Sequence, residues 1–349
     1  MLNVGIVGAG RIGRVHARSL AYTIPTARIA AIADEVVEAA RLVADQFRIP
    51  RVFQHYQEML EMPDLDAVLI CSSTDTHADI IVDAARAGKH IFCEKPIAKT
   101  LPSIDRALDA AEKAGVKLQI GFNRRFDTNY RRVRQAIETG EIGVPAFVHI
   151  ISRDPAPPPI EYVKVSGGIF LDMTIHDFDM ARYLVGAEVD EVYATGSVRV
   201  DPAIGEAGDL DTVFVVLKFE NGVVATIDNS RQAVYGYDQR VEAFGTGGKI
   251  STDNNFPNAA VLSDAHSVHR DLPLYFFLER YAESFAKEMA EFVDAVLHDK
   301  PTPVTGADGR APVVMGLAAR RSVDENRPVK ISEVSLTPEG RAQAGTRRG

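Results

Sequence analysis

The amino-terminal segment carries the pattern that most restricts how this chain can fold. An apolar run over residues 2–7 is followed directly by Gly8-Ala9-Gly10-Arg11-Ile12-Gly13, and a helical pattern continues from there. Gly8 permits a tight turn, Gly10 lets a pyrophosphate approach the backbone, and Gly13 lets the helix pack against the strand. The N–H groups at the start of that helix attract phosphate oxygens. The segment therefore predicts a strand, turn and helix that bind a dinucleotide.

Asp34 indicates which dinucleotide is bound. It follows the next apolar run, residues 27–33, at about 20 residues from the turn, where NAD sites carry their acid. Its carboxylate could accept hydrogen bonds from both ribose hydroxyls and would repel a 2′-phosphate. The first basic residue after it is Arg41. These features favour NAD over NADP.

Strand-like runs and helical patterns alternate strictly through the first third of the chain. Such alternation with apolar strands predicts a parallel sheet covered by helices on both faces. We expect residues 1–122 to form a Rossmann domain, a doubly wound parallel sheet, to which a last strand could return from the C-terminal region. The expected strands cover residues 2–7, 27–33, 67–72, 90–93 and 117–122, and the helices cover residues 11–22, 35–47, 75–88 and 102–115.

The second half has a different pattern, with β-like runs in succession near residues 190–200, 211–220, 222–230 and 236–245. Asn221-Gly222 between two of them is a strong hairpin signal. We expect residues 123–335 to form an α/β domain with a large open, mostly antiparallel sheet, and residues 336–349 to form a flexible tail. An exposed apolar sheet face has to be covered, so a symmetric dimer or tetramer joined through the open sheet is expected.

Composition excludes several classes of partner. The 349 residues carry a formal net charge of −9 and no long basic cluster, which argues against nucleic acid and anionic membranes. No apolar run approaches the roughly 20 residues that span a bilayer, and the amino terminus enters a strand with no room for a signal peptide. Cys71 and Cys93 are expected to be buried thiols, which suggests a cytoplasmic protein. No cysteine or histidine cluster has metal-ligand spacing.

Two loops follow strand-like runs at the carboxyl edge of the parallel sheet, where ligands gather in doubly wound folds. In Ser72-Ser73-Thr74-Asp75-Thr76-His77, hydroxyls could line the ribose and pyrophosphate, and His77 is a helix-start or cofactor-wall residue or else a catalytic one. Phe92-Cys93-Glu94-Lys95-Pro96 places Lys95 where a cation could polarise a reacting oxygen; the alternative is a solvated lysine. A cis bond before Pro96 is possible. The candidate cofactor contacts are Gly8, Gly10, Arg11, Ile12, Gly13, Asp34, Ser72, Ser73, Thr74, His77, Glu94, Lys95 and Asn123.

Residues 166–182 contain Gly167-Gly168 followed by Asp172 and His176. The acid and the imidazole are four residues apart, so one helix ending at Gly186 would place them on the same face. A histidine held in one tautomer by a carboxylate can accept a proton near neutral pH. The alternative is a structural or surface pair, which is the commoner meaning of this spacing.

Further polar side chains could bind a substrate with many hydroxyls. The segment that joins the two halves contains Asn123, Arg124 and Arg125. Asn123 and one arginine could donate to a polyol or to the cofactor, while the other arginine forms a structural ion pair. Asp154 and Tyr237 are either ligand contacts or turn and packing residues.

Together these segments resemble the Gfo/Idh/MocA family of NAD(P)-dependent oxidoreductases, from residue 2 to about residue 332. The resemblance implies a Rossmann domain joined to an α/β domain with a large open sheet, usually assembled as tetramers, so a homotetramer is expected. Segments 121–127, 172–182 and 235–238 look most like those of family members that oxidise inositols. The shared marks are the glycine turn with His16, Thr74-Asp75-Thr76-His77, Glu94-Lys95-Pro96, and Gly167-Gly168 with Asp172 and His176.

The resemblance implies a catalytic set and a reaction. His176 would remove a hydroxyl proton, Asp172 would orient the imidazole, and Lys95 would stabilise the developing oxygen charge, as NAD oxidises myo-inositol to 2-keto-myo-inositol. Asp154 stands where some inositol-oxidising members carry asparagine, so the preferred isomer stays open. The implied substrate contacts are Lys95, Arg124, Asp154, Asp172, His176 and Tyr237.

Other functions also fit the residues. The same chemistry could act on another inositol isomer or on an aldose. A sugar oxidoreductase or glycosidase that keeps NAD tightly bound is a further alternative. A dinucleotide sensor without catalysis is disfavoured, because a sensor has no need of the lysine, aspartate and histidine set.

Overall fold

The computed structural model describes residues 1–335, which fold into two compact units. The first unit comprises residues 1–126 and 283–313, and the second comprises residues 127–282 and the chain from residue 314. The segment that returns to the first unit is mainly helix α12 (Ala282–Leu297), rather than the strand that the sequence allowed for. The predicted tail at 336–349 lies outside the described residues.

A parallel sheet forms the centre of the first unit, with strand order β3-β2-β1-β4-β5-β6. The order reverses between β1 and β4, and ligands of doubly wound folds bind beside the carboxyl ends of the strands at this place. The predicted doubly wound sheet is confirmed. The strands are β1 (Leu2–Val7), β2 (Ala27–Ala33), β3 (Val52–Phe53), β4 (Ala67–Ile70), β5 (His90–Glu94) and β6 (Leu118–Gly121).

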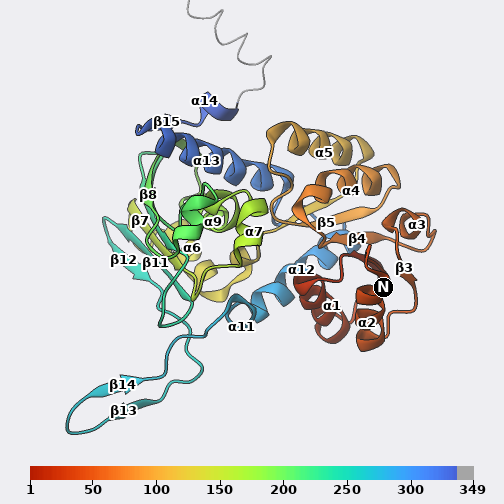
Figure 1. Cartoon of the computed structure of the whole chain (residues 1–349), viewed down its shortest axis with the longest axis horizontal. Helices are drawn as coiled ribbons and strands as arrows, with labels where there is room; N and C mark the ends of the chain where they lie inside the picture. Colours follow the sequence, from red (N-terminus) through yellow and green to blue (C-terminus); the bar gives the residue numbers. More distant parts are fainter. Residues whose placement is uncertain (336–349) are drawn as a thin grey trace, which may run out of the picture. The chain divides into compact units, whose positions relative to one another are not determined.

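Helices cover both faces of this sheet (Figure 1). One layer holds α1 (Arg11–Thr23), α2 (Val37–Phe47) and α12, and the other holds α4 (Thr74–Arg86) and α5 (Leu101–Ala114). The strands between them are apolar on both sides, as parallel strands buried on two faces require. Cys71 and Cys93 are both free and buried, which confirms the prediction of buried thiols. A short helix, α3 (Tyr56–Leu60), follows β3.

A larger sheet forms the second unit, in the order β12-β11-β7-β10-β9-β8-β15. Strands β7 and β10 are parallel, and the other neighbours are antiparallel, so the predicted mostly antiparallel sheet is confirmed. Gly222 has a φ of +87° in the predicted hairpin turn. The strands are β7 (Pro145–Arg153), β8 (Val189–Ser197), β9 (Thr212–Phe219), β10 (Val224–Ser230), β11 (Asp238–Gly245), β12 (Gly248–Ser251) and β15 (Val329–Lys330), with β13 (Val261–Ser263) and β14 (Val268–Arg270) forming a separate hairpin.

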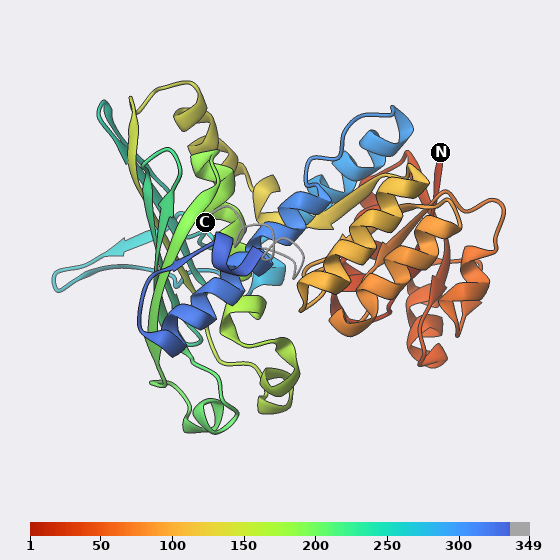
Figure 2. The ribbon, with the colours of Figure 1, turned by 90° about the horizontal axis from the view of Figure 1, so that it is seen from above.

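Helices of the second unit lie on one face of its sheet, which Figure 2 shows nearly edge-on. On the other face Phe147, Phe214 and Phe244 are exposed. None of the described helices is long and apolar enough to cross a membrane. The helices are α6 (Thr128–Glu138), α7 (Ile160–Ser166), α8 (Ile169–Asp172), α9 (Ile175–Val185), α10 (Pro202–Glu206), α11 (Phe277–Arg280), α13 (Gly306–Glu325), which begins in the first unit, and α14 (Ser332–Ser335).

Candidate functional site

The glycine turn of the first unit has the geometry that a dinucleotide needs. Gly8 has a φ of +106°, and a Cβ there would lie 2.6 Å from the carbonyl carbon and oxygen of Cys71. A Cβ on Gly13 would clash with the Gly8 carbonyl oxygen. A Cβ on Gly10 would instead meet no described atom within 4 Å. The first and third glycines are thus needed for packing, and the second leaves open backbone for a phosphate.

Asp34 lies beside this turn. Its Oδ2 accepts a hydrogen bond of 2.7 Å from the backbone N–H of Ala9, and its Oδ1 accepts one of 2.8 Å from Val36. The carboxylate is therefore fixed next to the glycines, where NAD places a ribose. Arg11 is exposed and Ile12 is half-buried at the start of α1. The open backbone and the adjacent acid fit NAD, and the individual cofactor contacts stay predictions.

The loop after β4 uses its polar groups to shape itself. The Oγ atoms of Ser72 and Thr76 are 2.7 Å apart, and Ser73 is the residue that precedes α4. His77 is buried, with Nδ1 2.9 Å from the Pro96 carbonyl oxygen and Nε2 3.1 Å from that of Ser72. Burial lowers the pKa of His77, and the two carbonyl contacts oppose the shift. This histidine ties together the ends of two strands, and a direct contact with the cofactor remains a prediction.

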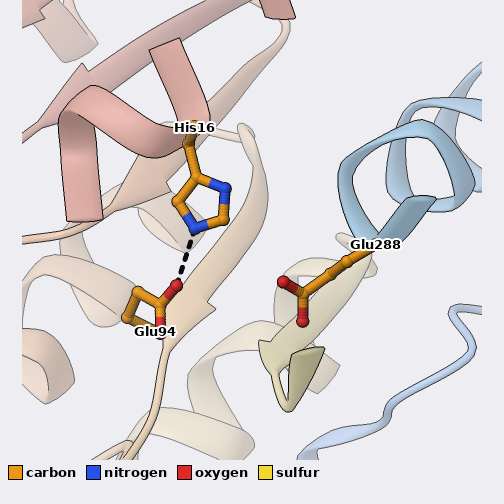
Figure 3. Close-up of side chains that lie close together, drawn as sticks. All are labelled: His16, Glu94 and Glu288. Carbon is orange, nitrogen blue, oxygen red and sulfur yellow. Dashed lines mark hydrogen bonds and ion pairs between the residues drawn. The ribbon is translucent and has the colours of Figure 1, made fainter. Parts of the chain in front are cut away.

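The loop after β5 contains Glu94, Lys95 and Pro96, and the Lys95–Pro96 peptide bond is cis, as the sequence allowed. Glu94 is 8% exposed, and its Oε1 lies 2.6 Å from Nε2 of His16 on α1. Figure 3 shows this pair with Glu288 of α12 nearby. The sequence identified His16 as a family mark, and Glu94 as a family mark and a candidate cofactor contact. Their direct bond shows that the residue before Lys95 is anchored in the protein interior.

The 3₁₀ turn Asn123–Phe126 ends the continuous part of the first unit. Asn123, Arg124 and Arg125 are all buried. Arg125 Nη2 lies 3.0 Å from Asp308 Oδ1. Burial alone would raise the pKa of Asp308, but Arg125 and hydrogen bonds from Thr305 hold it below its usual value. Arg125 thus forms an ion pair with Asp308, and the ligand contact of Arg124 stays a prediction.

In the second unit Asp172 belongs to a buried charge cluster. Arg231 is 1% exposed, and its Nη1 lies 3.1 Å from Asp172 Oδ2. Its Nη2 lies 3.5 Å from Asp209 Oδ2, and the other oxygen of Asp209 accepts a hydrogen bond from the Ile169 N–H. Tyr162 donates its hydroxyl hydrogen to Asp172 Oδ1 at 2.8 Å. We call Arg231, Asp172 and Asp209 the Arg231 cluster. It holds the Asp172 carboxylate in one orientation.

The prediction that one helix carries Asp172 and His176 is wrong. Helix α8 ends at Asp172 and α9 begins at Ile175. The N–H of Thr174 bonds to the carbonyl of Ile169, one residue farther back than in an α-helix, so the turn is widened. Helix α9 ends where predicted, with Gly186 at a φ of +69°. His176 is half-buried in the first turn of α9, and its Nδ1 faces the interior.

The other predicted substrate contacts of this unit lie on neighbouring segments of the sheet. Asp154 follows β7, and its backbone N–H and carbonyl bond to Ser230 and Ala233. Since β7 and β10 are parallel neighbours, Asp154 and Arg231 both lie just beyond the carboxyl ends of paired strands. Tyr237 is buried with its ring edge-on to that of Tyr281. Direct substrate contacts of Asp154 and Tyr237 stay predictions.

Several residues that shape the site were missed from the sequence. Arg231 and Asp209 lie outside every recognisable motif. Tyr162 lies in α7, the short helix before the one that ends at Asp172. The one available signal was Arg231, which directly follows the alternating pattern of β10. A long charged side chain at such a place has to be either exposed or paired. Glu288 lies within the apolar pattern of α12, at a position that is fully buried. An acid at such a position indicates a residue that shapes the site more strongly than any motif here.

A phosphate-binding turn on a doubly wound sheet, followed by a second unit with a large mixed sheet, defines a two-domain NAD-dependent oxidoreductase. Residues 2–122 match the family described as "Oxidoreductase family, NAD-binding Rossmann fold". Residues 130–251 match the "GFO/IDH/MocA C-terminal domain". The chain belongs to the Gfo/Idh/MocA family.

Relatives share nearly the whole chain. The myo-inositol 2-dehydrogenase of Thermotoga maritima is 48% identical over 95% of this chain and 99% of its own length. The inositol 2-dehydrogenase of Rhizobium meliloti is 44% identical over 94% of this chain and 98% of its own. The crystal structure of a Lactobacillus casei scyllo-inositol dehydrogenase with NAD(H) and scyllo-inositol is 32% identical, covers 95% of this chain and 99% of its own, and has a TM-score of 0.89.

Proposed function

We propose that this protein oxidises a ring hydroxyl of an inositol to a ketone with NAD, converting myo-inositol to 2-keto-myo-inositol. The observation that carries this proposal is the near full-length likeness to a myo-inositol 2-dehydrogenase, at 48% identity. The site supports it, because the chain retains Lys95, Asp172 and His176 and holds Asp172 between Arg231 and Tyr162.

The proposed mechanism assigns one task to each side chain. NAD, when bound, accepts the hydride from the alcohol carbon. His176 accepts the hydroxyl proton at Nε2, since its Nδ1 faces the interior, and Asp172 stabilises the imidazolium that forms. The Lys95 ammonium donates a hydrogen bond to the same oxygen as negative charge develops there.

Substrate selection is assigned to Arg124, Asp154 and Tyr237. Arg124 and Tyr237 can donate hydrogen bonds to ring hydroxyls, whereas the Asp154 carboxylate can only accept them. A ring with many hydroxyls of differing orientation suits such a set. The specific inositol isomer depends on how these groups match axial and equatorial hydroxyls.

The substrate is tested by measuring NADH formation with myo-inositol, scyllo-inositol, D-chiro-inositol and D-glucose. Rapid turnover confined to inositols supports the proposal, and a preference for scyllo-inositol would change only the isomer. Turnover mainly with glucose would replace the substrate and keep the chemistry. Turnover without added NAD, together with copurifying cofactor, would instead favour an enzyme that keeps NAD bound.

The proposed base is tested with His176→Ala. Removal of a positioned general base lowers kcat by about 10²–10⁴-fold. His298→Ala is the matched control, because His298 directly follows α12 and its exposed side chain contacts Asp294. Near-normal turnover by His176→Ala at neutral pH would refute the assignment.

The preference for NAD is tested at Asp34. Asp34→Ser removes the negative charge while retaining a short polar side chain that can still face the Ala9 N–H. We expect a higher KM for NAD and measurable turnover with NADP. A variant that still discriminates as strongly as the wild type would show that other residues exclude the 2′-phosphate.

A homotetramer assembled through the open sheet face is also part of the proposal. Phe147, Phe214 and Phe244 are exposed on three strands of that face, and a monomer gains by covering apolar area of this kind. Phe147→Asp should lower the molar mass measured by sedimentation equilibrium. A wild type that sediments as a monomer would overturn the assignment.

We expect the protein to work in the cytoplasm. The support is that both cysteines are free and buried thiols, as is usual in a reducing compartment. Fractionation of the source cells would test this expectation.

A further inference from the structure

A buried cluster of three ionisable side chains lies in the first unit, outside the catalytic set. His16 comes from α1, Glu94 from the end of β5 and Glu288 from α12, and their ligand atoms lie within 4.8 Å of one another. All three residues are buried. Figure 3 shows the side chains converging from three separate elements. We call them the His16 cluster.

The imidazole of His16 is held in one orientation. Its ring is edge-on to Phe92, with centroids 5.0 Å apart, and edge-on to Phe285 at 5.8 Å. Its Nε2 lies 2.6 Å from Glu94 Oε1. Because His16 is 0% exposed, this contact is shielded from water, and a charge-assisted hydrogen bond is stronger in such surroundings.

Glu94 is held just as closely from the neighbouring strand. It pairs with Gly121 of β6, and a Cβ at Gly121 would lie 3.0 Å from Glu94 Oε2 and 3.2 Å from its Cα. Because Gly121 has no side chain, there is room beside it for the Glu94 carboxylate. Any larger residue at position 121 would push Glu94 away from His16.

The cluster has the residue types of a metal site but not the spacing. Nitrogen and oxygen ligands lie about 2.0–2.2 Å from zinc, so ligand atoms of two different residues are separated by more than 3 Å. The 2.6 Å separation of His16 Nε2 and Glu94 Oε1 is that of a direct hydrogen bond. The geometry therefore indicates a proton between these two atoms.

We propose that His16 is a positioning residue for Lys95, acting through Glu94, an inference that rests on the role of Lys95 in the proposed function. Glu94 and Lys95 are adjacent, so their Cα atoms are about 3.8 Å apart, and fixing one fixes the backbone of the other. His77 holds the next residue of the loop, Pro96, from the opposite helix layer. The loop is thus held on both sides of the sheet.

The charges around the cluster explain why an imidazole serves here. Burial raises the pKa of Cys71, and the nearby Glu94 and Glu288 carboxylates raise it further. The ligand atoms of His16, Glu94 and Glu288 lie within 4.8 Å of one another, and an imidazole N–H can donate a hydrogen bond to a carboxylate at this place. An apolar residue of similar size would fill the space but leave Glu94 without this partner.

The test compares three variants with the wild-type holoenzyme. His16→Leu removes the donor and keeps the volume, His16→Gln keeps a donor at a similar reach, and Lys95→Met reports the role of the lysine itself. We expect His16→Leu to lower kcat by about 10–100-fold, since a displacement near 1 Å has an effect of this size. His16→Gln should recover most of the kcat.

Two controls separate positioning from a general loss of stability. Val43→Ala truncates another residue of the same hydrophobic core, on α2, and should lower Tm while kcat is retained. If His16 acts through Glu94, adding Glu94→Gln to His16→Leu should lower kcat little further. Should His16→Leu fail to fold, Glu94→Gln alone takes its place, since it keeps the shape of Glu94.

The outcomes differ for the two proposals. A normal kcat for His16→Leu together with an inactive Lys95→Met overturns the positioning role and leaves the proposed function standing. An active Lys95→Met removes the role of Lys95 and with it this inference. Crystal structures of wild type and His16→Leu with NAD supply a readout independent of substrate. A Lys95 Cα that moves by about 1 Å supports the proposal, and an unmoved one refutes it.

Discussion

The two units of the molecule each bury a charged cluster, and the clusters differ in what neutralises the carboxylates. In the Arg231 cluster a guanidinium that is 1% exposed lies between Asp172 and Asp209. In the His16 cluster an imidazole lies near Glu94 and Glu288. The guanidinium contacts both carboxylates of its cluster through separate nitrogens, whereas the His16 imidazole contacts one carboxylate through Nε2.

This difference suggests a division of tasks. The Arg231 cluster holds the Asp172 carboxylate in one place through contacts with two neighbouring side chains, Arg231 and Tyr162. The His16 cluster instead fixes a loop through a hydrogen bond that depends on the location of a proton. Replacing the cation should therefore have different consequences in the two units.

The largest expected effect comes from Arg231→Met, which retains much of the volume and removes the charge. Buried Asp209 and half-buried Asp172 would lose their shared partner, and breaking a buried ion pair destabilises by about 3–5 kcal/mol. We expect a large fall in Tm, measured by calorimetry, and a large loss of kcat because Asp172 is no longer held.

Arg132→Met is the matched control for that variant. Arg132 pairs with Glu141 in the same unit, but both side chains are about half exposed, so little change is expected. Equal losses of Tm in both variants would show that the buried position of Arg231 is not what makes it important.

The second prediction separates the adjacent arginines of the first unit. Arg125→Met breaks the bond with Asp308, and loss of a hydrogen bond to a charged group costs about 1.5–3 kcal/mol, so Tm should fall while the KM for inositol stays constant. Arg124→Met should raise that KM. The opposite result would exchange the roles of the two residues.

The third prediction concerns pH. Burial lowers the pKa of His77 below its ordinary value of 6.5 in the folded state, so folding favours the neutral ring. The stability that follows from this is fully present above pH 6.5 and is lost as the pH falls through the lower, folded-state value. His77→Gln should make unfolding, followed by urea titration, less sensitive to acid in that window. An unchanged pH dependence would contradict it.

The comparison also shows what the sequence could and could not predict. The glycine turn, Asp34 and five strands of the first unit follow from local patterns, because each is specified by neighbouring residues. The two-residue strand β3 was not predicted, because it is too short to show a pattern. The two clusters join residues far apart in the chain: Asp172 and Arg231 are 59 positions apart, and His16 and Glu94 are 78 apart. No local pattern encodes such pairs.

The break between α8 and α9 illustrates a second limit. Asp172 and His176 are four positions apart in the sequence whether they share one helix or lie on either side of a widened turn. Sequence periodicity therefore cannot distinguish these two structures. The backbone hydrogen bond from the Thr174 N–H to the Ile169 carbonyl shows that the turn is widened here. Likewise the ion pair of Arg125 could not be predicted from the sequence, because its partner Asp308 lies 183 positions away.

The smallest predicted effect tests how much the hydroxyl of Tyr162 adds to the Arg231 cluster. Tyr162 is 48% exposed, and its bond to Asp172 is 2.8 Å long. A partly exposed hydrogen bond contributes about 0.5–1 kcal/mol, so Tyr162→Phe should lower kcat about two- to five-fold and leave Tm nearly unchanged. A loss of kcat as large as that of Arg231→Met would mean that Tyr162, rather than the buried arginine, orients Asp172. In that case a hydrogen bond would orient the carboxylate in each cluster, and the two clusters would no longer differ in this respect.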